Sequence, residues 1–314
     1  MDTMKAVVCT QYGPPEVLKI VQYPKPTPKE DEVLIKIYAT SVTNSDIFIR
    51  SSKVALQLLI PFRMMIGLTK PRKAIIGEVF SGIVSEVGSK ITRFHVGDQV
   101  YGLTGFSLGA YAEYKCMKEE DSKQGCLAMK PKNLSFEEAT SAAYGGLLAF
   151  QFLEQATIQP NAKVLIYGAS GTSGIIALQF AKFLQAEVTG VCGPSHLNFV
   201  KALGADKTLD YTDANEIGKL ETYAVVLDCV GKARTSALKE ACKRALAPKG
   251  KYLSIDDAAL LLDSRRLDRI RALIESGQIT PVNDRCYPLD QIVEAHQYVE
   301  LGHKWGNVAI TVNN

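Results

Sequence analysis

At 314 residues the chain is longer than a single hydrophobic core usually serves, so two domains of about 100–200 residues each are expected. Hydrophobic residues make up 46% and charged residues 22% of the chain, as in an ordinary folded protein, which excludes a disordered chain. The 36 basic residues nearly balance the 33 acidic ones, so we expect no nucleic acid and no membrane as a partner.

The most apolar stretch of the first half, residues 54–68, is interrupted by Gln57, Pro61 and Arg63 and is shorter than the ~20 residues of a membrane-spanning helix. The N-terminus lacks the basic-then-apolar layout of a secretory signal, so a cytoplasmic protein is expected. Seven cysteines without a C-x-x-C pair predict neither a disulfide framework nor a structural zinc ribbon.

The elements of the first part of the chain are predicted to be strands. Residues 4–130 consist of short runs rich in Val, Ile, Tyr and Thr, such as 32–38, separated by Gly, Pro and Asp. Ser135 with Glu138 three residues later then forms a capping box before an alanine-rich stretch that ends near residue 156. A mostly β domain followed by a helix is expected.

From residue 163 onward strands and helices alternate, which predicts a parallel sheet with helices on its faces. A helix with apolar Leu267, Ile270, Leu273 and Ile274 and a final strand at 308–312 follow. The strands of the alternating region are expected at 164–167, 187–191, 223–228 and 250–255, and its first helix at 175–184.

The turn between the first of these strands and its helix is a variant of the G-x-G-x-x-G dinucleotide-binding motif. Gly171 allows backbone N–H groups to approach a pyrophosphate, and Gly174 allows the helix to pack closely on the strand. The positive end of the helix dipole then faces the phosphates. The alternative interpretation of this glycine motif is a tight turn that binds no ligand. The predicted cofactor-binding residues are Gly168, Ala169, Ser170, Gly171, Thr172, Ser173 and Gly174.

The turn after the second strand, residues 191–196, lacks the Asp or Glu that binds the ribose 2′-hydroxyl of NAD. A carboxylate ~4 Å from a 2′-phosphate would repel it by about 4 kcal/mol per unit charge at an effective dielectric near 20, so its absence permits NADPH. Ser195, His196 and Tyr211 are predicted donors to that phosphate. Because no Arg or Lys stands in the turn, NADH stays an alternative cofactor. Ser195 and His196 have a second interpretation, as surface turn residues that bind no phosphate.

Residues 77–88 and 94–102 resemble the zinc-free quinone oxidoreductase branch of the medium-chain dehydrogenase/reductase superfamily, which is related to zinc-type alcohol dehydrogenases. The resemblance implies an α/β fold: a GroES-like, mostly β domain from both chain ends, a Rossmann doubly wound parallel sheet that binds NAD(P), and a substrate cleft between them. The implied domains are 1–128 with 264–314, and 129–263. Supporting matches occur at 44–50, the glycine turn, 203–206, 223–231, 294–296 and 302–304.

By this resemblance, Thr43 and Asn44 take the positions of the Cys-His pair of zinc-binding relatives, and Glu78 follows Gly77 where Gly-His would stand. Zinc requires three or four N, S or O ligands at one point, which a hydroxyl, an amide and one carboxylate do not supply. The four-cysteine lobe of the zinc relatives is also missing. No metal is therefore expected.

Without a metal to polarise a carbonyl group, the substrate must already be electrophilic, which favours a small hydrophobic quinone or α,β-unsaturated carbonyl compound. The resemblance places the Asn44 amide beside the nicotinamide, where it is predicted to stabilise negative charge on the substrate oxygen. The alternative is that Asn44 only bonds nearby backbone in a turn.

Other residues near these positions have two interpretations each. Tyr144 is predicted to line the substrate cleft, or else to belong to the core. Residues 58–66 are apolar and read as an irregular segment, either a cleft wall or ordinary packing. Asp46 and Arg50, four residues apart, are expected to form a helix-surface ion pair outside the catalytic set.

Two departures from the family pattern stand out. Leu148 replaces a Thr that the family usually has near the cofactor, and residues 255–267 are shorter than usual, where the family often has another strand that pairs subunits. The sequence thus leaves a homodimer open.

We therefore predict an NADPH-dependent oxidoreductase that transfers hydride to a quinone or enone without zinc. The alternatives are an enoyl thioester or alkenal reductase with the same fold, and a non-catalytic NADPH-binding sensor. Residues 168–172 lack the second glycine of G-x-S-x-G, which excludes a serine hydrolase.

Overall fold

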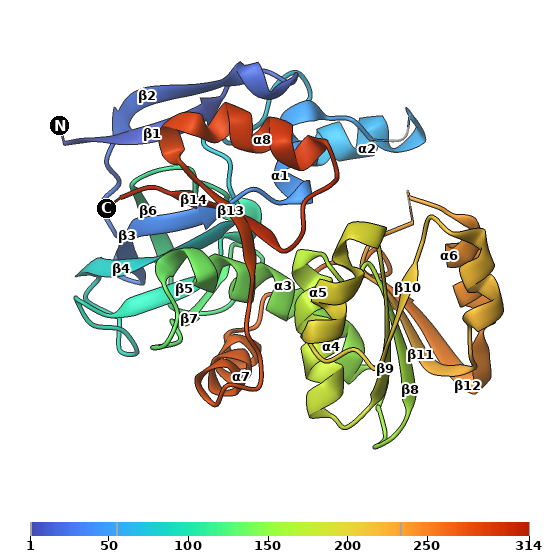
Figure 1. The fold of residues 1–314 in the computed structure, drawn as a ribbon. Coiled ribbons are helices and arrows are strands. Elements are labelled where there is room, and N and C mark those ends of the chain that lie inside the picture. Colours follow the sequence, from blue (N-terminus) through green and yellow to red (C-terminus); the bar gives the residue numbers. More distant parts are fainter. Residues whose placement is uncertain (1, 55, 233, 314) are drawn as a thin grey trace. The chain divides into compact units, whose positions relative to one another are not determined.

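The computed structural model describes residues 2–54, 56–232 and 234–313, without the side chains of residues 56–58. The chain divides into two compact units, which we describe one at a time (Figure 1). The first consists of Met1–Ala143, Leu262–Arg271 and Asn283–Asn314, and the second of Tyr144–Leu261 and Ala272–Val282. Within the described residues, no helix is both long and apolar enough to cross a membrane.

The first unit is mostly β and is built from both chain ends, as predicted. Its main sheet has the order β13-β14-β3-β4-β5-β7, and β6 also pairs with β3; a separate pair is formed by β1 and β2. The strands are β1 (Thr3–Cys9), β2 (Leu18–Pro24), β3 (Glu32–Ser41), β4 (Val79–Val87), β5 (Gln99–Leu103), β6 (Tyr114–Lys118), β7 (Cys126–Met129), β13 (Asn283–Pro288) and β14 (Asn307–Thr311).

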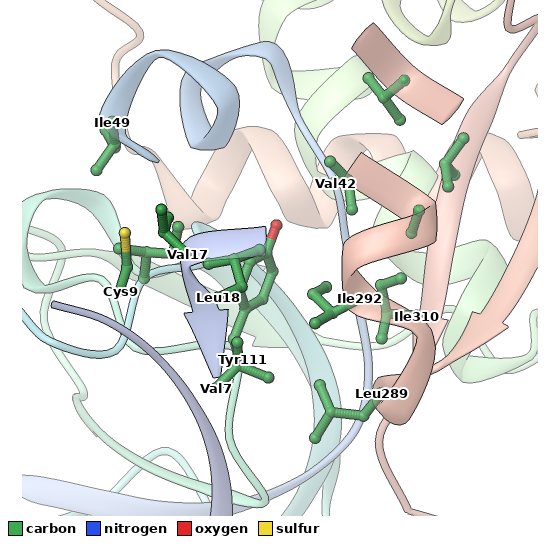
Figure 2. Close-up of a cluster of buried hydrophobic side chains, with 14 of the residues drawn as sticks. Val7, Cys9, Val17, Leu18, Val42, Ile49, Tyr111, Leu289, Ile292 and Ile310 are labelled. Atoms are coloured by element: carbon green, nitrogen blue, oxygen red, sulfur yellow. The ribbon is translucent and has the colours of Figure 1, made fainter. Parts of the chain in front are cut away.

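Three helices belong wholly to this unit: α1 (Asn44–Ser51), α2 (Leu56–Ile66) and α8 (Ile292–Glu300). One buried cluster joins β1, β14 and α8, and includes Val7, Tyr111, Ile292 and Ile310 (Figure 2). The cluster mixes residues from the first and last parts of the chain, so the two chain ends fold around a common core.

Residues 58–66 are not irregular, as the sequence suggested, but lie within α2. Pro61 removes one backbone N–H from this helix, yet the chain continues helically on both sides of it. Ile60 and Met64 on this helix are exposed rather than packed.

The second unit contains a five-stranded parallel sheet of order β10-β9-β8-β11-β12. Helices α4 and α5 lie on one face of it and α6 on the other (Figure 1), which confirms the predicted doubly wound sheet. The elements are β8 (Lys163–Tyr167), α4 (Thr172–Phe183), β9 (Glu187–Cys192), α5 (Leu197–Ala202), β10 (Lys207–Asp210), β11 (Tyr223–Asp228), α6 (Ala237–Arg244) and β12 (Leu246–Ser254).

Two helices, α3 (Phe136–Glu154) and α7 (Ser264–Glu275), are each divided between the units. The predicted capping box begins α3: the Ser135 N–H donates to Glu138 Oε2 at 2.8 Å, and the Glu138 N–H donates to Ser135 Oγ at 3.1 Å. The Phe136 ring stacks on Tyr38 of β3, with ring centroids 4.7 Å apart. The compact units therefore divide the chain differently from the predicted domains 1–128 with 264–314 and 129–263, whose bounds stay a prediction.

Candidate active site

The glycine turn follows β8 and is held by backbone hydrogen bonds to the next strand. Gly168 has φ +84°, a conformation that side chains with a Cβ rarely adopt. The N–H groups of Gly168 and Ala169 both donate to the Val191 carbonyl at 2.9 Å, and the Gly171 N–H donates to the Gly168 carbonyl at 3.0 Å. The turn thus has one defined shape at the carboxyl ends of β8 and β9.

Two glycines of this turn have different surroundings. A Cβ on Gly174 would lie 2.1 Å from the Gly168 carbonyl oxygen, so only glycine lets α4 pack this closely. A Cβ on Gly171 would have no neighbour nearer than 3.4 Å, so space is open beside it.

Gly171 is also the N-cap of α4, and no side-chain hydrogen bond caps it. The first N–H groups of a helix have no intrahelical acceptor, and the helix dipole favours an anion there. The open, uncapped turn fits the pyrophosphate of a dinucleotide.

The turn after β9 brings together two segments that are distant in sequence. The Tyr211 N–H donates to the Cys192 carbonyl at 3.1 Å, and the Tyr211 ring lies 3.5 Å from where a Cβ on Gly193 would stand. Ser195 is exposed and His196 half-buried in the 3₁₀ turn Pro194–His196. The three predicted phosphate donors thus gather at the carboxyl end of β9, while their role stays a prediction.

Sequence reasoning missed a carboxylate near this turn. Asp210 ends β10 and pairs in register with Cys192. Its Oδ1 accepts hydrogen bonds from both the N–H and the hydroxyl of Thr212, each at 2.8 Å. The Asp210 carboxylate therefore already accepts hydrogen bonds within its own turn.

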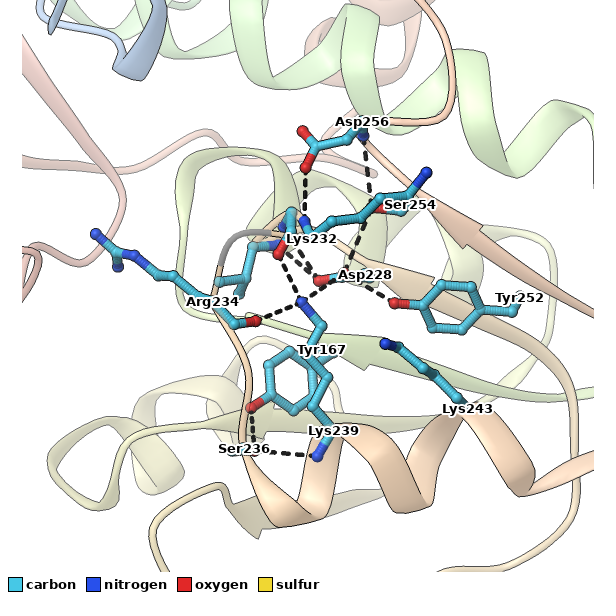
Figure 3. Close-up of polar contacts among 12 residues, drawn as sticks. Tyr167, Asp228, Lys232, Arg234, Ser236, Lys239, Lys243, Tyr252, Ser254 and Asp256 are labelled. Carbon is cyan, nitrogen blue, oxygen red and sulfur yellow. Dashed lines mark hydrogen bonds and ion pairs between the residues drawn. The ribbon is translucent and has the colours of Figure 1, made fainter. Parts of the chain in front are cut away.

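The loop after β11 borders the glycine turn, since a Cβ on Gly168 would lie 2.6 Å from Val230 Cγ2. Asp228, fully buried at the end of β11, holds this loop (Figure 3). Its Oδ1 accepts the N–H groups of Val230 at 3.0 Å and Gly231 at 3.2 Å, and its Oδ2 accepts the Tyr252 hydroxyl at 2.9 Å.

Lys239 of α6 completes this network from the other side (Figure 3). Its side chain is 1% exposed and its Nζ lies 2.7 Å from Asp228 Oδ2. Nζ also donates to the carbonyl groups of Gly231 at 2.6 Å and Arg234 at 2.8 Å. The one sign of the Asp228–Lys239 ion pair in the sequence is that Asp228 is the last residue of an otherwise apolar strand.

In the first unit, Thr43 is the N-cap of α1 and makes the side-chain hydrogen bonds of this turn. Its N–H and its hydroxyl donate to Asp46 Oδ2 at 2.9 and 2.8 Å, and its oxygen accepts the Asp46 N–H at 3.2 Å. Asn44, the first residue of the helix, is exposed. The capping box that begins α1 is formed by Thr43 and Asp46, without the Asn44 side chain.

The expected surface ion pair between Asp46 and Arg50 is wrong, because both side chains are completely buried. Arg50 instead donates to the Gly13 carbonyl at 2.7 Å and pairs with Glu300 of α8. Helix α8 covers this face of α1, which periodicity within a single helix does not reveal.

Glu78 lies directly before β4 with its Oε2 3.5 Å from the Thr43 hydroxyl oxygen. Burial and the neighbouring Asp46 carboxylate raise the pKa of Glu78 to about 8, and burial raises the pKa of Asp46 to about 6. Behind them the Tyr111 hydroxyl lies 3.1 Å from His296 Nε2, and burial lowers the pKa of His296 to about 3.

The remaining predicted residues lie on α3. Tyr144 is half-buried, and Leu148 is buried. Over residues 2–54, 56–232 and 234–313, no three His, Cys, Asp or Glu side chains gather in a way that could hold a metal ion.

Family models match residues 29–129 and 174–310 of the chain. Residues 29–129 match the alcohol dehydrogenase GroES-like domain, and residues 174–255 and 255–310 match two models described as zinc-binding dehydrogenase.

Individual relatives agree with this match. A 2-methylene-furan-3-one reductase of Solanum lycopersicum is 31% identical, over 98% of this chain and 79% of its own length. A chloroplastic NADPH-dependent alkenal/one oxidoreductase of Arabidopsis thaliana is 28% identical over the same shares. The structure of a quinone oxidoreductase from Coxiella burnetii superposes with a TM-score of 0.83 at 26% identity, over 99% of this chain and 100% of that one. The chain therefore belongs to the quinone oxidoreductase-like branch of the medium-chain dehydrogenase/reductase superfamily.

Proposed function

We propose that this protein is an NADPH-dependent oxidoreductase that transfers hydride to a quinone or an α,β-unsaturated carbonyl compound without zinc. The observation that carries the proposal is the glycine turn, where Gly171 leaves an open, uncapped helix end while Gly174 closes the packing beneath it. Relatives named as alkenal/one and quinone oxidoreductases support the reaction type.

NADPH, when bound, supplies the hydride. The turn from Gly168 to Gly174 would hold its pyrophosphate, and Ser195, His196 and Tyr211 would bind a 2′-phosphate. The loop that Asp228 and Lys239 fix borders the same turn, so its backbone would contact the dinucleotide. NADH is the weaker alternative, because no carboxylate stands in the turn after β9 to bind a 2′-hydroxyl group.

The Asn44 amide would donate a hydrogen bond to the substrate oxygen as negative charge develops on it. The support is that Asn44 is exposed while Thr43 carries the capping of α1. We propose a small hydrophobic carbonyl compound as substrate, with Tyr144 lining its site, and neither nucleic acid nor membrane as a partner. A cytoplasmic location remains part of this proposal.

The test is oxidation of NADPH, and separately NADH, by purified protein with a panel of quinones and enones, with and without a metal chelator. We expect chelator-insensitive turnover that favours NADPH. The Asn44→Ala variant should bind NADPH as the wild type does but lose about 10²-fold in kcat, as for removal of one oxyanion donor. Exposed Asn198 of α5, changed to Ala, is the matched control.

Cofactor binding without any turnover would favour the non-catalytic sensor. Loss of activity with the chelator would instead contradict zinc independence. Preference for alkenals or enoyl thioesters over quinones would select the alternative that the alkenal/one oxidoreductase relative suggests.

A further inference from the structure

Glu78 carries a carboxyl group that the proposed reaction has not yet used. The Thr43 hydroxyl oxygen lies 3.5 Å from Glu78 Oε2. Asn44 follows Thr43 in the sequence and is the first residue of α1. Glu78 is half-buried, so its carboxyl group adjoins the proposed oxygen donor and is still reached by solvent.

Behind Glu78 stands a second carboxyl group with an unusual environment. Asp46 is completely buried, and its Oδ2 accepts both the N–H and the hydroxyl of Thr43. Its Oδ1 has no hydrogen-bond partner among the described residues. Two carboxyl groups that lie against one hydroxyl, one of them completely buried, cannot both ionise without a large cost, so the pair retains a proton.

The hydrogen bonds of the pair favour the proton on Glu78. Asp46 Oδ2 accepts both donors of Thr43, which stabilise its charged form, whereas burial and the Asp46 charge raise the pKa of Glu78. Tyr111, from the segment before β6, is the next titratable group: burial and the charges of Asp46 and Glu78 raise its pKa, while Arg50 of α1 lowers it. The Gly77 N–H and the Tyr111 hydroxyl also stabilise charge on Asp46, which favours the proton on Glu78.

We propose that the Glu78 carboxyl group donates the proton that an α,β-unsaturated carbonyl substrate gains on reduction, and that Thr43 and Asp46 are positioning residues for this proton. The inference rests on the proposed function.

In the reduction of an enone, the β-carbon receives hydride and the carbon–carbon double bond breaks. Its electron pair forms a double bond between the α-carbon and the carbonyl carbon, and the π electrons of the carbonyl group move to the oxygen, which gives an enolate. The O–H bond of Glu78 then breaks, a C–H bond forms at the α-carbon, and the ketone is restored. Glu78 is left as a carboxylate and regains a proton from water; the substrate is reduced by two electrons and the nicotinamide is oxidised.

A quinone makes a different demand on the protein. Hydride addition to a quinone leaves a hydroquinone anion, which is a much weaker base than an enolate and is protonated by water after release. A proton donor in the protein therefore matters for enones and hardly for quinones.

The first experiment compares the wild type with Glu78→Gln on one enone and one quinone, with NADPH as reductant. We expect kcat for the enone to fall about 10²-fold or more, the usual contribution of general acid catalysis, while kcat for the quinone stays near the wild-type value. Glu86→Gln is the control, because Glu86 lies on the adjoining strand β4 but is exposed and pairs with Lys25. In D₂O the wild type should place deuterium on one face of the α-carbon, and Glu78→Gln should lose that preference.

A second experiment separates proton donation from a structural role. The wild-type kcat for the enone should fall as pH rises through about 8, because Glu78 loses its proton there. In Asp46→Asn the nearby negative charge is gone, so this fall should move to lower pH. Infrared pH-difference spectra of the cofactor-free chain should show a protonated carboxyl band near neutral pH that Glu78→Gln lacks.

The outcomes are distinguishable from failure of the proposed function. A wild type that turns over neither substrate class contradicts the proposed function itself. Equal losses on enone and quinone in Glu78→Gln, an unchanged pH profile in Asp46→Asn, or a wild type that reduces quinones but no enone would each overturn the proton-donor role alone.

Discussion

His296 of α8 is fully buried, and its Nε2 faces the Tyr111 hydroxyl while Nδ1 has no partner among the described residues. Burial lowers the pKa of His296 to about 3 from an ordinary 6.5. Between about pH 3 and pH 6.5, His296 is therefore protonated in the unfolded chain and neutral in the folded chain. This part of the stability is fully present above pH 6.5 and is lost as pH falls towards 3.

We expect His296→Gln to lose less stability than the wild type when pH falls from 7 to 5. The difference should approach about 2 kcal/mol, since each pH unit below 6.5 is worth about 1.4 kcal/mol for one proton. Thermal unfolding followed by circular dichroism at several pH values measures it, with His95→Gln as the control because the His95 side chain is 81% exposed. Parallel pH curves for His296→Gln and wild type would contradict the assignment.

Glu78 acts on stability with the opposite sign. Its folded-state pKa is raised from 4.5, so the stability it contributes is present below pH 4.5 and is lost as pH rises through about 8. The two residues titrate in overlapping ranges, pH 3–6.5 for His296 and pH 4.5–8 for Glu78. Comparing each variant with the wild type at the same pH isolates the contribution of the residue that was changed.

At the scale of elements, the β11–α6 loop depends on one buried ion pair. Removing a single partner of such a pair leaves an uncompensated charge and costs roughly 3–5 kcal/mol. In Lys239→Met we therefore expect a large loss of stability together with weaker NADPH binding, because Gly231 and Arg234 lose the ammonium group that holds their carbonyls. Chemical denaturation and a fluorescence titration with NADPH measure the two effects.

Lys243→Met is the matched control for that variant. Lys243 lies one turn further along α6, and its ammonium group pairs with half-exposed Glu240 on the surface, so its loss should cost under about 1 kcal/mol. Lys243→Met that weakens NADPH binding as much as Lys239→Met would show that the loop is not the cause.

The glycine turn offers a second test of an element. Gly174→Ala places a Cβ 2.1 Å from the Gly168 carbonyl oxygen, so α4 must move away from the turn. We expect a loss of about 1–3 kcal/mol in stability and a large loss of NADPH affinity. Gly218→Ala in the same unit is the control, since a Cβ there meets nothing within 4 Å. Unchanged NADPH affinity in Gly174→Ala would argue against a phosphate site at this turn.

At the scale of the whole molecule, the parallel sheet ends at β12, which pairs only with β11 in the described structure. This edge strand contains Pro248, Lys249 and Lys251, and its pairing with β11 shifts register between Tyr223 and Val225. Proline, lysine and an irregular register are devices that discourage pairing with another strand. We therefore expect the protein to sediment at low micromolar concentration as a single chain of 34.3 kDa.

Sedimentation velocity over a concentration series checks this expectation. A stable dimer that persists on dilution would contradict it, and would show that subunits associate without a further strand beyond β12. Pro248→Val with Lys251→Val should, by the same reasoning, increase self-association.

The sequence alone determined the features that depend on near neighbours in the chain. The capping box at Ser135, the strand–turn–helix around Gly171 and the alternation that specifies a parallel sheet all follow from local spacing, because a backbone turn or a helix face is set by residues a few positions apart. The sequence alone is therefore enough to predict a cofactor site at the glycine turn.

Only the tertiary structure decided which side chains are buried together. The Asp46 and Arg50 pattern predicts a surface pair, but α8, more than 240 residues later, covers them. Long-range packing likewise brings Asp228 into its ion pair with Lys239. It also places Glu78 beside Thr43, which is hydrogen-bonded to Asp46. Burial changes the energy of a charge far more than local spacing does, so the protonation states that bear on the chemistry become visible only when the chain is folded.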